Sequence, residues 1–208
     1  MVRGFTEEEK ESIRALLMEE GKQLFARFGL KKTSIAELTK AAGISPSAFY
    51  NFFQSKEELY AAIFEEEENK LQESLMGKIS QSDQDDFQKT LQSILMIGKE
   101  ALTTNPFIVQ LVLKGDITHL MRKLPKERIE THMLRDYDQF FPMLEHFQGE
   151  GKVIAKDRKV LVTVMQLFFL LHVHRKDFDP EVFDQATDLL AQWIARGMTS
   201  GNCEEEQD

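Results

Sequence analysis

The sequence predicts an all-α protein, and three observations lead to this prediction. Apolar residues recur at helical spacing along almost the whole chain. No stretch alternates apolar and polar residues for long enough to predict a strand. Capping residues and helix-starting prolines stand where helix ends are expected. The predicted architecture is an N-terminal three-helix module of helix-turn-helix type, followed by a larger helical body, about nine helices in all.

The first two helices are predicted from an apolar stripe and a capping box. The stripe covers residues 13–28 and ends at Gly29, a residue suited to closing a helix. Ser34, followed three positions later by Glu37, is a capping box and starts a short second helix that ends before Gly43.

The third and fourth helices begin at two further capping signals. Ser45 followed by Pro46 predicts a short third helix, because a proline at the first helical position loses no hydrogen bond. Ser55 and Glu58 form a second capping box, which predicts the start of a long fourth helix.

The rest of the chain is predicted to fold into further helices separated by X-Pro breakers and a glycine-containing loop at residues 148–152. The expected helices span about residues 84–103, 105–115, 125–148, 157–176 and 180–197. The predicted domains are the helix-turn-helix module at residues 1–55, a body at 56–200 and a disordered acidic tail at 201–208.

Charge is distributed unevenly between the two predicted parts. The chain has a formal net charge of -9, yet residues 21–56 hold six Lys or Arg side chains against Glu37 alone. A small basic module before an acidic body favours a polyanionic partner for the module. The alternative is that a short basic window is only a solvated surface.

Cysteine usage and hydropathy predict a cytoplasmic protein without a membrane partner. The lone Cys203 cannot form an internal disulfide, which favours a reducing compartment. The opening MVRGFTEEEK has no apolar leader segment. The longest apolar run, residues 160–173, is shorter than the roughly 20 residues that span a bilayer.

The second and third predicted helices have the geometry of a helix-turn-helix. Each is about two turns long, and residues 42–45 join them. Gly43 suits the turn, Ile44 can fill a small core, and Ser45 caps the next helix. The start of that helix would fit a major groove, with its backbone N–H groups toward the DNA.

A denser set of residues extends this pattern over about residues 13–60. The set comprises Thr33-Ser34, Leu38, Ala42-Gly43-Ile44-Ser45, Phe49-Tyr50, Phe52-Phe53 and Ser55-Lys56-Glu57-Glu58-Leu59. At these spacings the sequence resembles the DNA-binding signature of the TetR family of transcriptional regulators. The resemblance implies a repressor that binds a palindromic DNA operator as a homodimer and is released by a small, mostly apolar effector. The alternative is a helical adaptor or scaffold of the same fold that binds no operator.

The resemblance also implies which residues contact DNA. Tyr50 and Lys56 would contact phosphates, with help from Thr33 or Ser34. The residues expected at the groove floor are Ser45, Pro46, Ser47, Ala48 and Asn51. The remaining apolar members of the set are interpreted as the core of the module. Thr39, Ser47 and Asn51 depart from the family pattern, so the operator sequence cannot be taken from relatives.

The body is expected to form a dimer interface. Residues 157–176 are apolar nearly all round, so their helix must be covered by its own core or by a second chain. The resemblance implies that the last two helices pair with their copies in a homodimer. The candidate interface residues are Leu161, Met165, Phe169, Leu189 and Trp193.

An effector pocket is expected in the body because Asp136 falls within an apolar stripe. A carboxylate there marks the polar spot of a lipophilic pocket, or it is paired within the body or solvated. The candidate effector residues are Leu91, Leu95, Phe107, Met133, Asp136, Tyr137, Phe140, Phe168 and His172.

No catalytic, metal or cofactor site is predicted. His172 and His174 are two positions apart, about 200° around a helix, and pairs three or four apart share a face. Cys203 lies in the tail, and no nucleotide-binding glycine motif or catalytic triad signature is present. An enzyme is therefore not expected.

Overall fold

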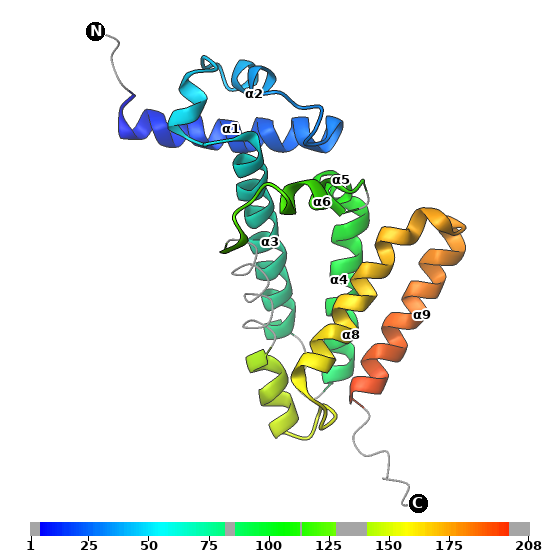
Figure 1. The fold of residues 1–208 in the computed structure, drawn as a ribbon. Helices are drawn as coiled ribbons and strands as arrows, with labels where there is room; N and C mark the ends of the chain where they lie inside the picture. Colours follow the sequence, from blue (N-terminus) through cyan, green and yellow to red (C-terminus); the bar gives the residue numbers. More distant parts are fainter. Residues whose placement is uncertain (1–4, 82–85, 113, 128–140, 200–208) are drawn as a thin grey trace, which may run out of the picture. The chain divides into compact units, whose positions relative to one another are not determined.

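The computed structural model describes residues 5–81, 86–112, 114–127 and 141–199, and over these ranges it is helical without a strand. This confirms the predicted fold class. The elements are α1 (Glu7–Phe28), α2 (Ile35–Ala41), the 3₁₀ helix η1 (Ala48–Asn51), α3 (Lys56–Gln81), α4 (Phe87–Thr104), α5 (Pro106–Val112), α6 (Asp116–Met121), α8 (Arg158–Leu171), the 3₁₀ helix η2 (His172–Asp177) and α9 (Pro180–Thr199). Residues 141–149 are also helical. Figure 1 shows the order of the elements.

The chain divides into two compact units, and neither is continuous in sequence. The first consists of Met1–Lys70 and Thr103–Pro125, and the second of Leu71–Leu102 and Lys126–Asp208. The predicted functional boundary at residue 55 stays a prediction. The predicted tail, 201–208, lies outside the described residues.

Local capping explains where the first helices begin. Thr6 and Glu9 cap α1 reciprocally. The predicted capping box of Ser34 and Glu37 is confirmed at the start of α2. Before α3 the Ser55 hydroxyl accepts the Glu58 N–H at 3.1 Å, as expected. The Glu58 carboxylate, however, accepts the Gln54 N–H at 2.6 Å, so the return bond reaches one residue further back than a capping box requires.

Two predicted helices differ from the structure in type or length. The third is the 3₁₀ helix η1, a tighter turn common in short connecting pieces. The helix predicted over 157–176 ends as an α-helix at Leu171. The ring of His172 bonds the Phe168 carbonyl, and the His172 backbone N–H bonds Phe169 and Leu170 instead. The chain therefore tightens into η2.

The chain between α4 and residue 127 contains one helix more than predicted. The predicted helix at 105–115 is α5, which ends at Val112, and α6 follows. Gly115 separates the two with a φ of 82°, a left-handed conformation that glycine adopts readily. Of the helix predicted at 125–148, residues 141–149 are seen as helix, and 128–140 lie outside the described residues.

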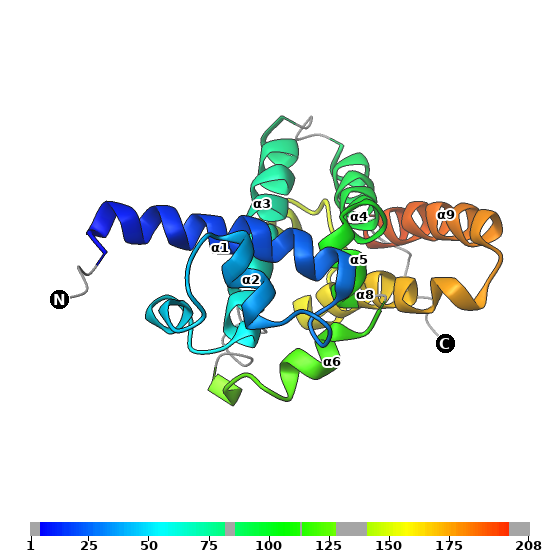
Figure 2. The same ribbon diagram turned by 90° about the horizontal axis from the view of Figure 1, so that it is seen from above.

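The core of the first unit is built around three stacked aromatic rings. The Tyr60 ring lies 4.8 Å from that of Phe25 and 4.6 Å from that of Phe107, measured between centroids. None of the three is exposed. These contacts join α1, α3 and α5. In Figures 1 and 2, α2 lies alongside α1, in agreement with their packing contacts.

The core of the second unit lies between α4, α8, α9 and residues 141–149. Gly98 of α4 is buried, and a side chain there would clash with the Phe169 ring, so the absent Cβ permits this close packing. Figure 1 shows α8 and α9 side by side. Within the described ranges, no helix has the length and apolar character needed to cross a membrane.

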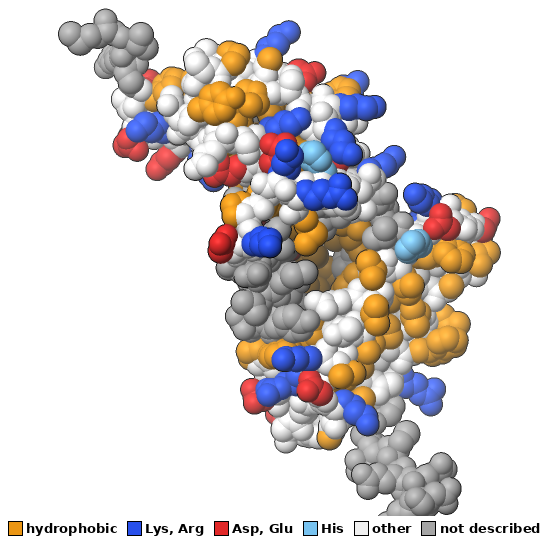
Figure 3. All heavy atoms as spheres, in the orientation of Figure 1, with side chains coloured by type: hydrophobic (Ala, Val, Ile, Leu, Met, Phe, Trp, Pro, Cys, Tyr) orange, Lys and Arg blue, Asp and Glu red, His pale blue; other side chains and the backbone are white. Residues whose placement is uncertain are grey.

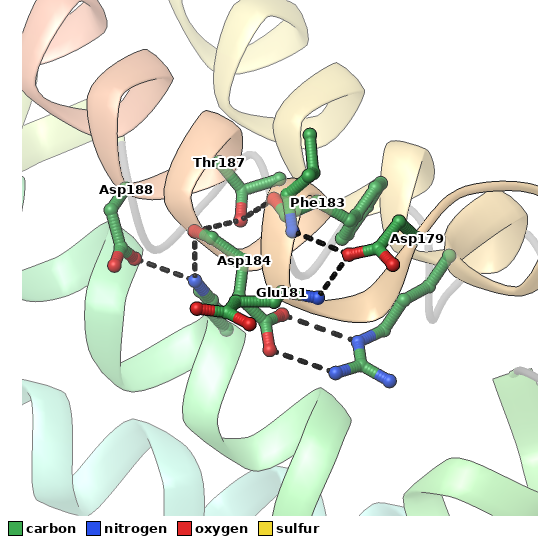
Figure 4. A network of polar contacts seen from close by, with 9 residues as sticks. Asp179, Glu181, Phe183, Asp184, Thr187 and Asp188 are labelled. Carbon is green, nitrogen blue, oxygen red and sulfur yellow. Dashed lines mark hydrogen bonds and ion pairs between the residues drawn. The ribbon is translucent and has the colours of Figure 1, made fainter.

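A polar network fastens α4 to α9 inside this unit (Figure 4). The Lys99 ammonium, largely buried, donates to the Asp184 carbonyl at 2.9 Å and to the Asp188 carboxylate at 2.5 Å. Arg175 of η2 holds the Asp184 carboxylate with two hydrogen bonds. These bonds keep the pKa of Asp184 below its ordinary value, with Arg175 the largest cause.

Candidate nucleic-acid interface

Buried aromatic and aliphatic residues hold the predicted helix-turn-helix together. Leu38 of α2 and Phe49 of η1 have no exposed surface, and Phe53 is 3% exposed. Gly43 makes the turn with a φ of 70°. Their place in the core of the first unit confirms the interpretation that these apolar residues are scaffold.

The short segment after the turn presents polar and aromatic groups outward. Ser45, Pro46, Ser47 and Asn51 are exposed and Ala48 is half-buried. The Ser45 and Ser47 hydroxyls lie 3.0 Å apart, and Ser45 also accepts the Ala48 N–H at 3.3 Å. These bonds link Ser45, Ser47 and Ala48, three of the five residues predicted for the groove floor.

Tyr50 is the most prominent side chain of this surface. It is 61% exposed, and its ring meets the Phe49 ring edge-on at a centroid distance of 5.7 Å. Because Phe49 is buried, the contact fixes the base of the Tyr50 ring while its hydroxyl remains available. Such an arrangement suits the predicted phosphate contact.

Thr33 and Ser34 are placed differently from each other. Thr33 is 1% exposed, and its hydroxyl donates to the Gly29 carbonyl at 2.9 Å, so it is directed inward. Ser34 is exposed, and its hydroxyl donates to the Glu37 carboxylate at 2.7 Å. Hydrogen bonds from Ser34 hold the pKa of Glu37 below its ordinary value. Of the pair, only Ser34 lies at the surface.

Lys56 makes main-chain contacts that the sequence analysis missed. Its ammonium donates to the carbonyl oxygens of Leu30 and Thr33, each at 2.7 Å, and of Lys31 at 3.3 Å. It therefore braces the chain between α1 and α2. These partners lie 23 to 26 positions away in the sequence, so no local sequence pattern predicts these contacts.

The first unit also carries exposed basic side chains. Lys31, Lys32 and Lys40 are all exposed on the first unit. Figure 3 shows Lys and Arg side chains gathered in the upper part of the view, where this unit lies. A phosphate backbone would be attracted to such a surface, in a salt-dependent manner.

The predicted effector residues that the structure describes belong to two different units. Leu91, Leu95, Phe168 and His172 are buried in the second unit, each with at most 1% exposure. Phe107 instead belongs to the core of the first unit. The other four predicted residues, Met133, Asp136, Tyr137 and Phe140, lie outside the described residues.

His172 is buried with one ring nitrogen unpaired. Its Nδ1 donates to the Phe168 carbonyl at 3.1 Å, while no group in the described ranges hydrogen-bonds its buried Nε2. The rings of Phe168 and Phe183 meet it edge-on at 5.3 and 5.5 Å. Burial lowers the pKa of the imidazole, which favours the neutral form.

The predicted dimer residues are divided between core and surface. Leu161 and Met165 are each 2% exposed and face the core of their own unit, whereas Phe169 is half-buried. Leu189 and Trp193 are exposed. Leu161 and Met165 thus lie on the inward face of α8, and a sequence that is apolar all round a helix does not reveal which side its own unit covers.

A larger exposed apolar surface lies on the other side of α8 and continues onto α9. We call it the α8–α9 apolar face; its members are Val160, Leu167, Leu170, Leu171, Phe178, Val182, Leu189 and Trp193. Figure 3 shows hydrophobic side chains gathered over these two helices. Contiguous apolar surface of this kind marks an interaction site in soluble proteins.

Comparison with known proteins finds a family match for the N-terminal part of the chain. Residues 17–63 match the family described as "Bacterial regulatory proteins, tetR family". The chain is 32% identical over 74 residues to the HTH-type transcriptional regulator AcrR of Shigella flexneri. That match covers 36% of this chain and spans about a third (32%) of the relative's length.

Solved structures share the fold over nearly the whole chain. A TetR-family transcriptional regulator from Pectobacterium atrosepticum has a TM-score of 0.72 at 20% identity, covering 94% of this chain and 98% of its own. RolR in complex with resorcinol has a TM-score of 0.61 at 19% identity, covering 93% of this chain and 98% of its own. Residues 17–63 thus match the tetR family of bacterial regulatory proteins, and the chain shares the fold of solved TetR-family regulators.

Proposed function

We propose that the protein is a DNA-binding repressor that acts as a homodimer on a palindromic operator. The observation that carries this proposal is the surface of the η1 segment. Tyr50 and Asn51 are exposed beside the buried Phe49, and the same unit carries exposed lysines. A short, rigidly based segment with polar tips can enter a major groove, and the lysines attract the phosphates on either side.

The homodimer is supported by the α8–α9 apolar face. Trp193 and Val182 are more than half exposed, and leaving such side chains in water is unfavourable. A second copy of the same face would cover them in a two-fold arrangement. Two-fold symmetry would place two recognition segments over half-sites about one DNA turn, roughly 34 Å, apart.

Release by a small, mostly apolar effector is proposed for the second unit. Support comes from the Nε2 atom of His172, which is buried among aromatic rings without a hydrogen-bond partner in the described residues. A group that donates a hydrogen bond would satisfy its Nε2. RolR, which shares this fold, was solved with resorcinol, a small aromatic diol.

The proposal is tested by selecting binding sites from random duplex DNA with the full-length protein at two salt concentrations. A palindromic sequence should be enriched, and the affinity for it should fall steeply with salt because phosphate contacts release counterions. An Asn51→Ala variant should relax the selection, whereas Gln23→Ala, an exposed change on α1, should not. Failure to enrich any sequence would contradict DNA binding and favour an adaptor of the same fold.

A further inference from the structure

The compact unit that carries the candidate DNA surface is completed by a distant segment of chain. Residues 103–125 belong to the same unit as residues 1–70. Helix α5 packs on α1, and the fully buried Phe107 stacks on Tyr60. The three-helix module is therefore not a separate body, since part of its core comes from α5.

Asp116, at the start of α6, is the polar link between this segment and the module. It is 6% exposed, and its Oδ2 accepts the Leu30 N–H at 2.7 Å. The same oxygen accepts from the Gln110 amide at 3.3 Å and from the Tyr60 hydroxyl at 3.5 Å. A buried carboxylate is unfavourable unless hydrogen bonds satisfy it, and here donors from three other parts of the unit converge on one atom.

Both backbone polar groups of Leu30 are hydrogen-bonded to side chains. Asp116 accepts its N–H, and the Lys56 ammonium donates to its carbonyl at 2.7 Å. The Leu30 side chain is fully buried as well. Only three residues separate it from Ser34, the first cap of α2, so the placement of this peptide sets where α2 begins.

Gly29 shows how closely the chain fits around Asp116. Its φ is 80°, in the left-handed region. A Cβ atom on Gly29 would lie 2.5 Å from the Gln110 Nε2 and 3.2 Å from the Asp116 Oδ2. The left-handed backbone favours glycine here, and a side chain at this position would also displace the Gln110 amide that donates to Asp116.

We propose that Asp116 is a positioning residue for DNA binding: its carboxylate fixes the corner between α1 and α2 and so the direction in which α2 and η1 meet DNA. This inference rests on the proposed function. Asp116 does not itself contact DNA, because it is buried. Its loss leaves the Leu30 N–H buried without an acceptor, so the corner moves to find another partner.

The first readout is operator affinity as a function of salt. Full-length Asp116→Ala should bind the selected operator about tenfold more weakly, the equivalent of one lost hydrogen bond to a charged group. The slope of log affinity against log salt should be unchanged, because no phosphate contact is removed. Asp116→Asn, which retains an acceptor oxygen of the same size, should recover part of the loss.

The second readout is hydrogen exchange of the peptide that contains Leu30. Exchange there should be faster in Asp116→Ala and nearer the wild-type rate in Asp116→Asn. The matched control is Asp157→Ala, which removes an aspartate cap from α8 in the other unit. It should change neither operator affinity nor the exchange of Leu30.

Wild-type affinity in Asp116→Ala would overturn the inference, as would a weaker affinity with unchanged Leu30 exchange. If Asp116→Ala does not fold, Asp116→Asn and Gln110→Ala carry the same two readouts, since each weakens the contacts of the Oδ2. Wild-type protein that selects no DNA would overturn the proposed function instead. The exchange of Leu30 would then still show whether Asp116 fixes the corner.

Discussion

The ammonium group of Lys56 lies 2.7 Å from the main-chain oxygen of Leu30, which stands 26 positions earlier in the chain. This bond and those to Lys31 and Thr33 satisfy three carbonyl groups between α1 and α2. The family resemblance implies a phosphate contact for the same lysine. The structure gives it a second role, as a brace inside the module.

Replacing Lys56 tests this brace. Lys56→Met keeps much of the chain length but removes every donor, so the free energy of unfolding should fall by about 1–3 kcal/mol. Urea unfolding measures the change, with Lys40→Met, an exposed lysine of α2, as the control. Unchanged stability would contradict the brace. If the slope of log affinity for DNA against log salt is about one unit smaller in Lys56→Met than in the wild type, Lys56 also contacts a phosphate.

Tyr50 is expected to affect DNA binding without affecting stability. Tyr50→Phe retains the contact with Phe49 and removes only the hydroxyl, so affinity should fall about three- to tenfold. Because the side chain is 61% exposed, the melting temperature should stay the same. Fluorescence anisotropy with the selected operator checks the first expectation and thermal unfolding the second. Wild-type affinity in Tyr50→Phe would show that the Tyr50 hydroxyl does not contact DNA.

Trp193 is expected to be central to self-association. Trp193→Asp places a charge in the α8–α9 apolar face, and desolvating that charge between two copies is unfavourable. The protein should become a folded monomer with weakened operator binding, as measured by sedimentation and circular dichroism. Leu16→Asp, which changes an exposed apolar residue of α1 (47%), is the control and should leave the dimer intact. A dimer that persists in Trp193→Asp would place the interface elsewhere.

His172 should make stability depend on pH. Because burial lowers its pKa below the ordinary 6.5, the folded protein binds fewer protons at this residue than the unfolded chain. The free energy of unfolding should therefore fall as pH drops from about 6.5 through the lowered pKa. Lys99 lowers this pKa further, and the Asp184 carboxylate opposes it.

Urea unfolding of His172→Gln across this pH range checks the expectation. The variant should lose the part of the pH dependence that arises as pH falls below about 6.5, whatever its stability at neutral pH. His174→Gln, which removes an exposed histidine two positions away, should retain it. An unchanged pH profile in His172→Gln would show that His172 is not the group that titrates.

Most helix starts were predictable because their causes lie within one turn of chain. Ser34 and Glu37 meet across three residues, and Pro180 opens α9 as expected. The helix-turn-helix was predictable for the same reason, since Gly43 and the residues beside it form the turn locally. The missed helix α6 began at a glycine whose left-handed conformation the sequence permits but does not require.

The functional roles of several side chains depended on partners far along the chain. Asp116 and Leu30 are 86 positions apart, and no local pattern pairs them. Leu161 and Leu167 are the same residue type in one helix, yet Leu161 is in the core and Leu167 is on the surface. The amino-acid sequence thus determined the helical class, most helix starts and the helix-turn-helix, because these depend on neighbouring residues. Only the tertiary structure decided which polar groups are buried and which apolar faces remain open, because that depends on which distant segments pack together.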